Sequence, residues 1–359
     1  MPDTELTNLY DLTLPELTAL LAGWGQPAYR ARQLWEWLYR HYAGEFETMT
    51  TLPGALRERL AAETTLAIGK IALSQHSSDG QTEKVLFQLP DGQYIETVLM
   101  RYQKRRTLCI STQAGCAMGC VFCATGQMGF MRHLSVAEIV GQAIYFARQL
   151  AAEGQHVTNI VMMGMGEPLH NYDNTLAAVD RLTDPAGMNL GARKITISTV
   201  GLIPAIRRYA DEQRQTPLAV SLHAATDEER SRLLPVNRRW PLAELMEACR
   251  YYVMQTGRRM TFEWALIAGE NDTEEQAHKL GTLLRGMLGH VNLIPLNPTA
   301  GYGGIPSSPE RVGRFQEILT DYGVTSTVRV RRGIDIQAGC GQLRDRHLMD
   351  VKQQPAGGR

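Results

Sequence analysis

The stretch GCAMGCVFC, from Gly115 to Cys123, is the most informative segment of this 359-residue chain. Its C-x3-C-x2-C spacing supplies three cysteine thiolates, whereas a [4Fe-4S] cluster is normally held by four. A cluster held by only three leaves one iron open to bind and reduce a small molecule. The alternative is a structural zinc site, but such sites usually pair one C-x2-C with a second Cys or His pair, and none follows here. The segment therefore predicts an iron-sulfur site with Cys116, Cys120 and Cys123 as its ligands.

The composition is that of an ordinary soluble globular protein, with 44% hydrophobic and 21% charged residues, and its length suffices for one large domain and a smaller one. No long apolar run occurs, and the start, MPDTELTNLY, is acidic and polar, so we expect neither a membrane span nor a signal peptide. Six cysteines, three of them clustered, do not resemble the disulfide framework of a small secreted domain. We therefore expect a cytoplasmic protein.

The formal net charge of zero gives no support for nucleic-acid binding, which usually leaves a basic footprint. The charge is uneven, however, because basic residues outnumber acidic ones after residue 325. Two interpretations of this basic run stay open: a local surface that contacts RNA, or a solvated strand and tail. The arginines concerned are Arg329, Arg331, Arg332, Arg344 and Arg346.

The first seventy residues read as a small helical domain. Thr13 and Glu16 form a capping-box pair before a stretch with helical apolar spacing, and a second helix is predicted over about 28–42. On that second helix Arg30 and Trp37 lie off the apolar face. Such side chains can stack on bases and contact phosphates, but a core face with a solvated rim is the commoner arrangement. The RNA role of this domain stays a hypothesis.

The rest of the chain predicts an α/β fold. Residues 84–100 favour a β-hairpin around the turn Pro90-Asp91-Gly92. From Thr107 onward, short β-rich runs alternate with candidate helices, which implies βα units and a parallel sheet. The count falls short of a closed eight-unit barrel, so we predict an open partial (β/α) barrel of about six units.

The predicted organisation has four parts. They are a helical accessory domain over 1–70, a β-hairpin linker over 71–104, the barrel core over 105–346 and a disordered tail over 347–359.

Four further motifs are spread over the chain: TLCISTQAGC at 107–116, MMGMGEP at 162–168, SLH at 221–223 and AGCGQL at 338–343. The cysteine spacing, with Phe122 before the third cysteine, is what radical S-adenosylmethionine (SAM) enzymes carry. With the other motifs, the chain resembles the RlmN/Cfr family, and most closely its RlmN branch. Members of that family methylate an aromatic carbon of adenosine in RNA. The resemblance runs from about residue 6 to about residue 343, and a partial barrel is typical of it.

By motif match, the resemblance implies a set of SAM contacts. They are Gly166, Glu167, Ser198, Ser221, Leu222, His223 and Asn297. Each ends or follows a predicted strand, and functional residues of βα barrels lie at those carboxyl ends, so we expect them to converge. The glycines would allow close backbone approach, and Glu167 would meet the ammonium or ribose of SAM. A helix-first-turn acid for Glu167 and a hydrogen-bonded core histidine for His223 remain the alternatives.

The resemblance also implies a route for the methyl group. One SAM methylates the Cys340 thiolate, and a second SAM, bound at the open iron, is reductively split to a 5′-deoxyadenosyl radical. That radical removes hydrogen from the S-methyl group, and the resulting carbon radical adds to adenine. Glu96 would then take the ring proton, and Cys109 would free Cys340 by closing a disulfide with it. A half-buried hairpin carboxylate on a solvent face is the alternative for Glu96.

The function that the resemblance implies is C2-methylation of an adenosine in 23S ribosomal RNA, at the peptidyl-transferase centre, with transfer RNA as a second candidate substrate. The nearest alternative is C8-methylation of the same nucleotide, the Cfr activity. A radical SAM enzyme acting on a small molecule or peptide, and a non-catalytic RNA-binding module with a structural metal, are the others. The implied cofactors are a [4Fe-4S] cluster and two SAM molecules per turnover. We expect a flavodoxin- or ferredoxin-like electron donor, a monomer and no membrane contact.

Overall fold

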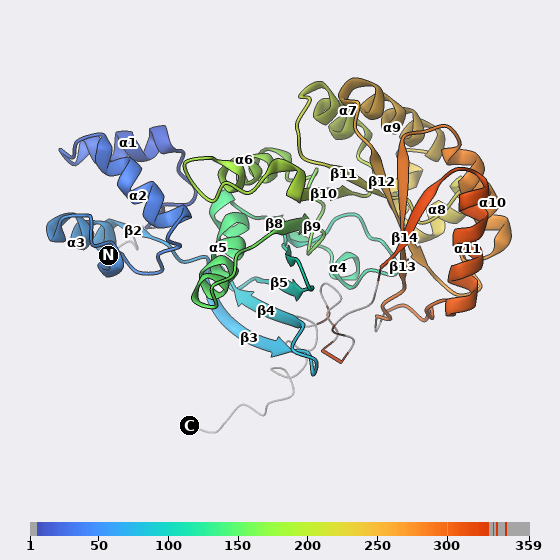
Figure 1. Cartoon of the computed structure of the whole chain (residues 1–359), viewed down its shortest axis with the longest axis horizontal. Coiled ribbons are helices and arrows are strands. Elements are labelled where there is room, and N and C mark those ends of the chain that lie inside the picture. The colour runs from blue at the N-terminus through green and yellow to red at the C-terminus, as the bar shows by residue number, and fades with distance from the viewer. Residues whose placement is uncertain (1–5, 300, 330–332, 334, 337–341, 343–359) are drawn as a thin grey trace.

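The structure is a computed structural model that describes residues 6–299, 301–329, 333, 335, 336 and 342 (Figure 1). The N-terminal helices lie at one end of the long axis, and helices of the later βα units lie at the other end. Among the described residues, none of the helices combines the length and the apolar character that crossing a membrane would need.

The N-terminal part carries three α-helices in its described residues: α1 (Leu14–Gly23), α2 (Tyr29–Tyr39) and α3 (Gly54–Glu63). The predicted capping box is present, because Thr13 Oγ1 accepts from the Glu16 N–H at 3.1 Å and the Glu16 carboxylate accepts from the Thr13 N–H at 2.7 Å. Helix α2 ends before the predicted boundary at 42, where Tyr42 has a left-handed backbone with a φ of 53°.

Two side chains expected off the apolar face of α2 form hydrogen bonds within the N-terminal part of the chain. The Arg30 guanidinium donates to the Thr51 carbonyl at 3.0 Å, and Trp37 Nε1–H donates to Thr51 Oγ1 at 2.7 Å. A short parallel pair, β1 (Thr7–Asn8) with β2 (Thr64–Thr65), joins the beginning of this part to its end. These contacts fit a solvated rim and leave the RNA role as a hypothesis.

The described residues form a ten-stranded sheet in the order β14-β13-β12-β11-β10-β9-β6-β5-β4-β3. The strands on the β14 side, through to β6, pair in parallel, and the remaining three are antiparallel. The parallel strands are β6 (Arg106–Cys109), β9 (Asn159–Met162), β10 (Ile195–Thr199), β11 (Leu218–Ser221), β12 (Met260–Leu266), β13 (Gly289–Pro295) and β14 (Thr325–Val328).

One long helix follows each parallel strand except the last in the described chain. These helices are α5 (Val136–Ala152), α6 (Tyr172–Thr183), α7 (Ile203–Asp211), α9 (Leu242–Thr256), α10 (Glu274–Leu284) and α11 (Pro309–Asp321). The predicted partial barrel of about six βα units is thus confirmed. Two shorter elements, α8 (Asp227–Leu233) and the 3-10 helix η3 (Pro235–Arg238), precede α9.

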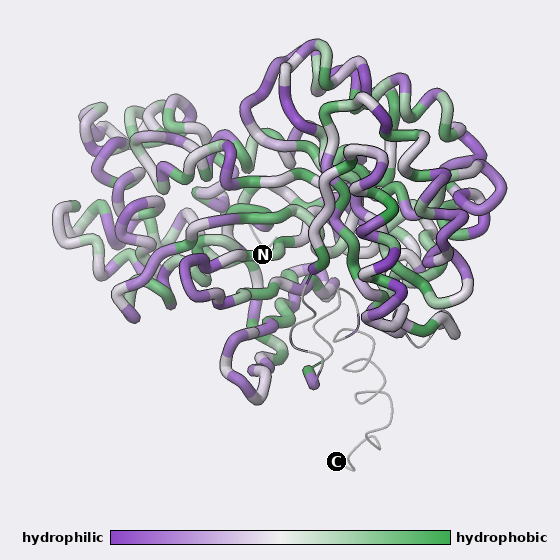
Figure 2. Tube along the Cα trace, turned by 45° about the vertical axis from the view of Figure 1, so that its right-hand side comes forward, coloured by the Kyte–Doolittle hydropathy of each residue, from purple (hydrophilic) through white to green (hydrophobic). Residues whose placement is uncertain are grey.

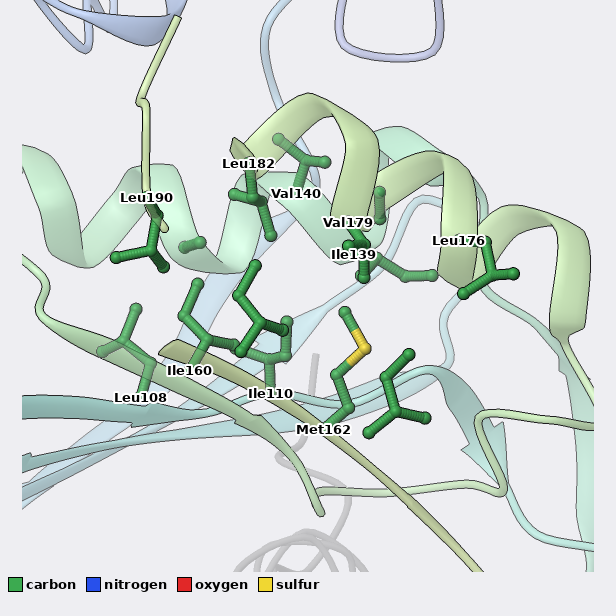
Figure 3. Packing of buried hydrophobic residues seen from close by; sticks show 14 of the residues in the cluster. Leu108, Ile110, Ile139, Val140, Ile160, Met162, Leu176, Val179, Leu182 and Leu190 are labelled. Atoms are coloured by element: carbon green, nitrogen blue, oxygen red, sulfur yellow. The ribbon is translucent and has the colours of Figure 1, made fainter. Parts of the chain in front are cut away.

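The core lies between the helices and the sheet because the helices turn their apolar faces inward. Figure 3 shows this for α5 and α6: Val140 and Leu182 meet Ile160 of β9 in one buried cluster. The hydropathy colouring agrees, since hydrophobic stretches follow the central strands and the outer turns are more hydrophilic (Figure 2). Buried apolar side chains therefore hold the strand ends, and the residues on them, in fixed places.

The predicted hairpin is present and belongs to the large sheet. It consists of β4 (Thr82–Gln88) and β5 (Tyr94–Arg101), with β3 (Lys70–His76) on the outer side. Gly92 at its turn has a φ of 82°, which glycine adopts without strain. Strand β5 pairs antiparallel with β6, so the hairpin extends the barrel sheet. The domain boundaries at 70, 104 and 346 stay a prediction, and the tail over 347–359 lies outside the described residues.

Candidate active site

A cavity of about 280 Å³ opens at the carboxyl ends of the parallel strands. The cysteine loop lies beside it, between β7 (Gln113–Gly115) and β8 (Phe130–His133). Most of the predicted cluster and SAM residues line this cavity: Cys116, Cys120, Cys123, Gly166, Glu167, Ser198, Ser221, His223 and Asn297. Segments that are far apart in sequence therefore meet in one place. This agrees with the rule that functional residues of βα barrels lie at the carboxyl ends of the strands, called here the strand-end rule.

Backbone contacts fix the cysteine loop on the barrel. The Val121 N–H donates to the Leu233 carbonyl at 3.1 Å, so the loop is tied to α8. Cys123 is the N-cap residue of the short helix α4 (Ala124–Gln127). Gly126 has no room for a side chain, because a Cβ there would lie 2.8 Å from the Cys120 carbonyl oxygen. The loop is therefore compact, with its three thiols turned to one cavity.

The donor set of this loop fits an iron-sulfur cluster. Burial, the largest cause, raises the pKa of Cys116 to about 12, and burial also raises the pKa of Cys120 and Cys123. Thiolates at these positions therefore need a positive group beside them, which a bound metal centre supplies. Among the described residues no group of three or more His, Cys, Asp or Glu side chains is arranged to hold a metal ion.

A cluster makes a different demand from a single ion, because each thiolate binds its own iron. The three thiols need to face one space and do not need to share one point. The described residues that line the cavity include these three cysteines and no fourth. The site therefore suits a [4Fe-4S] cluster that keeps one iron for another ligand.

Glu167 is a buried carboxylate in the cavity wall, 4% exposed. Its Oε2 accepts from the Val200 N–H at 2.8 Å and its Oε1 accepts from the Leu169 N–H at 3.0 Å. Burial, the largest cause, raises its pKa to about 7, and the hydrogen bonds act in the opposite direction. A carboxylate has about four acceptor sites, and a side-chain hydrogen bond from Thr199 takes a third, so one site remains for an ammonium or a hydroxyl. Glu167 precedes α6, whose first-turn acid is Asp173, so the alternative of a helix-first-turn acid is wrong, while its turn contacts are compatible with a binding role.

Gly166 is required by the protein's own packing. Its φ is 102°, and a Cβ there would lie 2.5 Å from Cβ of Gln113 on β7. The Gln113 Oε1 also accepts from the Glu167 N–H at 2.8 Å, which holds this turn against β7. We expected the glycines to permit close approach of SAM, whereas the close approach of Gly166 in the structure is to strand β7.

His223 is a neutral imidazole with a fixed tautomer. Its Nδ1 accepts from the Ala265 N–H at 2.8 Å, so the ring proton lies on Nε2. Burial lowers the pKa of His223 to about 3, and the ring meets Phe122 edge to face with centroids 5.0 Å apart. Its φ of 58° is unusual for a residue with a side chain. The expected core histidine is thus also a cavity residue that offers one N–H donor.

Leu222 differs from the other predicted SAM residues because its side chain is fully buried in the main core and does not line the cavity. Its backbone holds strands together: the Leu222 N–H donates to the Glu263 carbonyl at 3.0 Å. The SAM role of Leu222 stays a prediction that only its backbone could fulfil.

Two charged residues of the cavity were not predicted as site residues. Glu263 lies within the otherwise uncharged strand β12, and its Oε2 accepts from Asn292 Nδ2–H at 2.8 Å. Burial raises its pKa, and Arg329 acts in the opposite direction. Arg329 follows β14 and lines the cavity, although the sequence leaves it either on an RNA surface or on a solvated strand. The isolated carboxylate in the strand MTFEWAL is the signal that could have revealed Glu263.

Glu96 is fully buried on β5, so the alternative of a half-buried, solvent-facing carboxylate is wrong. Its Oε2 lies 2.7 Å from Lys84 Nζ, with the two side chains 1% and 0% exposed. The Glu96 carbonyl accepts from Ser111 Oγ–H at 2.6 Å, and the same Oγ accepts from the Met165 N–H at 2.9 Å. Glu96 is thus tied to the turn that carries Gly166, without lining the cavity itself.

Cys109 is a buried residue at the end of β6, opposite Val98 of β5 in the sheet register. It packs with Met100 and the partly buried Met163. Met163 lines the cavity, so Cys109 lies behind the cavity wall. Cys340 lies outside the described residues, and its pairing with Cys109 stays a prediction.

Comparisons with known proteins agree with this fold and site. The profile of the Radical SAM superfamily matches residues 110–281, and that of the ribosomal RNA large subunit methyltransferase N-terminal domain matches residues 7–66. The chain is 59% identical over 346 residues to the dual-specificity RNA methyltransferase RlmN 1 of Myxococcus xanthus (strain DK1622), covering 96% of each chain. It is 53% identical over 354 residues to the probable dual-specificity RNA methyltransferase RlmN of Chloroflexus aurantiacus, covering 96% of this chain and 94% of that relative.

A solved structure of a radical SAM methyltransferase is also similar to this chain. The crystal structure of a radical SAM methyltransferase from Sphaerobacter thermophilus superposes with a TM-score of 0.91 at 52% identity, covering 94% of this chain and 98% of that chain. The fold and the three-cysteine cavity thus define a radical SAM protein, a class that uses a [4Fe-4S] cluster and SAM. With near-full-length relatives this similar, the chain belongs to the RlmN family. The predicted family, fold class and cofactors are confirmed.

Proposed function

We propose that this chain is a radical SAM methyltransferase that transfers a methyl group to C2 of an adenosine in 23S ribosomal RNA, with transfer RNA as a second substrate. One observation carries the proposal: the three thiols share a cavity with most of the predicted SAM contacts. The relatives that match over nearly the whole chain are named dual-specificity RNA methyltransferases, which supports RNA as the substrate. The N-terminal match to a ribosomal RNA methyltransferase domain supports it further.

The cavity residues have defined roles in this proposal. Cys116, Cys120 and Cys123 would hold the cluster, which when bound supplies the electron that reductively cleaves SAM. The Glu167 carboxylate would accept from the SAM ammonium, and His223 Nε2–H would donate to an acceptor on SAM. The remaining contacts would come from neutral polar groups: the hydroxyls of Ser198 and Ser221, the amide of Asn297 and the backbone of Gly166 and Leu222.

The methyl group would reach the RNA through a cysteine. We propose that the Cys340 thiolate forms a bond to the methyl carbon of one SAM as the sulfonium C–S bond breaks. After the 5′-deoxyadenosyl radical has removed one hydrogen atom from the S-methyl group, the same carbon would bond to adenine C2 and bridge it to Cys340. Glu96 would take the C2 proton, and the Cys109 thiolate would attack the Cys340 sulfur, so that a disulfide forms as the bond between that sulfur and the bridging carbon breaks. The released carbon would take up a proton to become the methyl group, and the one surplus electron of the adduct would leave to an electron-transfer partner. The nearness of the two residues supports this division of roles: Cys109 of β6 is opposite Val98 of β5, and Glu96 lies two residues before Val98 on the same strand.

The remaining expectations belong to the same proposal. The helical domain over 1–70 would contact RNA, and an external flavodoxin- or ferredoxin-like protein would deliver electrons. The protein would act as a monomer in the cytoplasm, where its RNA substrates are found.

Anaerobic reconstitution with iron and sulfide, followed by methylation of 23S ribosomal RNA with SAM and dithionite, tests the proposal. Nuclease digestion and mass spectrometry should show 2-methyladenosine, whereas 8-methyladenosine would establish the C8 alternative. Cys340→Ala should abolish methylation, and Cys249→Ala, at a buried cysteine of α9, should not.

Two outcomes would contradict the proposal that the chain is an RNA methyltransferase. SAM cleavage without RNA methylation, unaffected by Cys340→Ala, would indicate a small-molecule or peptide substrate. Bound iron without SAM cleavage would indicate a binding module with a structural metal.

A further inference from the structure

Arg230 is a fully buried guanidinium on α8, beside the cysteine loop. It donates to three backbone carbonyls and one amide oxygen. The acceptors are the oxygens of Val200 at 2.6 Å, Asn237 Oδ1 at 2.8 Å, Leu222 at 3.3 Å and Ser221 at 3.4 Å. All four are neutral, and none of the ion pairs found among the described residues involves Arg230.

A buried charge is costly unless a counter-charge compensates it. Burial, the largest cause, lowers the pKa of Arg230 to about 10, and the neighbouring group that acts most strongly against this is Cys120. Two other groups act on Arg230: the buried Cys249 thiol, and Asp227, whose Oδ1 accepts from Asn237 Nδ2–H at 2.9 Å. The Val121 N–H donates to the Leu233 carbonyl at 3.1 Å, so the cysteine loop is bonded to the helix that carries Arg230, and the negative charge of a bound cluster would lie beside this helix.

Packing places Arg230 directly behind the cavity. Val200 and Ser221, whose carbonyls accept from the guanidinium, both line the cavity. Val200 also belongs to the apolar cluster against which Cys120 packs, and Leu233 of α8 is part of the same cluster. Arg230 thus bonds the ends of β10 and β11 together beneath the site where cluster and SAM would meet.

We propose that Arg230 is the buried counter-ion of the cysteine-bound cluster and, at the same time, a positioning residue for the strand ends that border the SAM cavity. The inference rests on the proposed occupation of the three-cysteine site. A [4Fe-4S] cluster on three thiolates carries net negative charge and gains one more on reduction. A fixed cation behind it favours the reduced form and so raises the reduction potential.

The test compares four variants of the full-length, anaerobically reconstituted protein. Arg230→Met and Arg230→Gln remove the charge, and Arg230→Lys keeps it with fewer donors. Arg232→Met is the matched control, because Arg232 is an exposed residue of the same helix. Iron and sulfide contents are measured first, and the cluster potential is then determined by dithionite titration followed by electron paramagnetic resonance.

We expect both neutral variants to shift the one-electron reduction equilibrium at least about tenfold toward the oxidised cluster, equal to about 59 mV. Arg230→Lys and Arg232→Met should stay within about twofold of the unmodified protein near neutral pH. Arg230→Lys should weaken SAM binding about tenfold, since one ammonium cannot replace the guanidinium fork at both strand ends. Unchanged potentials in both neutral variants would overturn the counter-ion role, and unchanged SAM affinity in Arg230→Lys would overturn the positioning role.

A second measurement keeps the inference testable if the neutral variants do not fold. A buried lysine loses its proton more easily than an arginine, so the cluster potential of Arg230→Lys should fall as the pH rises from about 8 to 10. The unmodified protein should show no such fall. Parallel behaviour of the two proteins over this range would refute the counter-ion role. Protein that takes up no iron would sink the proposed function, whereas loaded protein with unaltered potentials would sink only this inference.

Discussion

The two groups of predicted reactive residues lie in different parts of one sheet. The cluster and SAM residues come from the carboxyl ends of parallel strands and share an open cavity. Glu96 lies on the antiparallel strand β5 and Cys109 on its neighbour β6, and both are buried and do not line the cavity. The cofactor side of the reaction is therefore accessible to ligands in the described structure, and the acid-base side is sealed. Because the two groups lie apart, substitutions should be able to disrupt cofactor binding and methyl release separately.

The largest effect should follow from loss of a cluster thiol. Cys120→Ala removes a ligand that no other described cavity cysteine replaces, so bound iron should fall and both SAM cleavage and RNA methylation should be lost. Iron analysis and a cleavage assay with dithionite measure this. Cys249→Ala is the control, because Cys249 is equally buried but lies on α9 in the main core. Full iron content in Cys120→Ala would contradict the site.

Glu96→Gln should affect the sealed side alone. Loss of a general base typically costs about 10²- to 10⁴-fold, so methylated RNA should form that much more slowly while SAM cleavage persists. A covalent protein–RNA adduct should accumulate, visible as a shifted band in denaturing gels. Glu263→Gln is the matched control, because Glu263 is also a buried carboxylate but lines the cavity. Glu263→Gln should weaken SAM binding without trapping RNA. A covalent protein–RNA adduct in both variants would contradict the distinction between the cofactor side and the acid-base side.

The contrast between the two regions also explains what the sequence could predict. Strand and helix order, the partial barrel and the convergence of Glu167, Ser198 and His223 follow from local periodicity and the strand-end rule. Glu263 escaped because it lies inside a strand, where the rule does not apply. The Lys84–Glu96 pair escaped although the hairpin was predicted, because Lys84 is opposite Val98 and Glu96 is opposite Leu86, and this register is a property of the folded sheet.

Gly166 shows the same limit of prediction from sequence, which is that contacts between distant segments are not visible in it. The sequence predicts that Gly166 permits a close approach but not to what, because the contact is with Gln113 of another strand. Likewise, the basic run after residue 325 was read as surface, whereas Arg329 lines the cavity. The chemistry of these side chains could be predicted from residue type, but their partners could not.

On the cofactor side, SAM affinity should depend on pH through Glu167. Burial raises the pKa of this carboxyl to about 7, so the protonated form dominates below pH 7 and cannot pair with the SAM ammonium. Affinity should therefore rise about tenfold per pH unit below pH 7 and level off above it, with proton release on binding. Calorimetry in two buffers of different ionisation enthalpy measures the SAM affinity and the number of protons released on binding. Asn297→Ala should weaken binding with the same pH dependence, and Glu167→Gln should abolish that dependence.

The same shift predicts the pH dependence of the unliganded protein. The folded-state pKa is raised above the ordinary value of 4.5, so the folded protein holds this proton more tightly than the unfolded chain. The stabilising contribution of the bound proton is complete below pH 4.5 and is lost as the pH rises toward 7. A Glu167→Gln protein that keeps the wild-type pH dependence of unfolding in this range would assign the raised pKa to another group.

The smallest effect should come from the N-terminal helices, which carry neither group of reactive residues. Thr13→Ala removes the side-chain oxygen that accepts from the Glu16 N–H, and loss of such a cap costs about 1 kcal/mol. Chemical denaturation should show this loss, with SAM affinity and cluster potential unchanged. Thr13→Ser, which keeps the capping oxygen, should restore the stability. If Thr13→Ala instead lowered methylation of RNA without changing SAM cleavage, the N-terminal helices would act on the RNA itself, as proposed for residues 1–70.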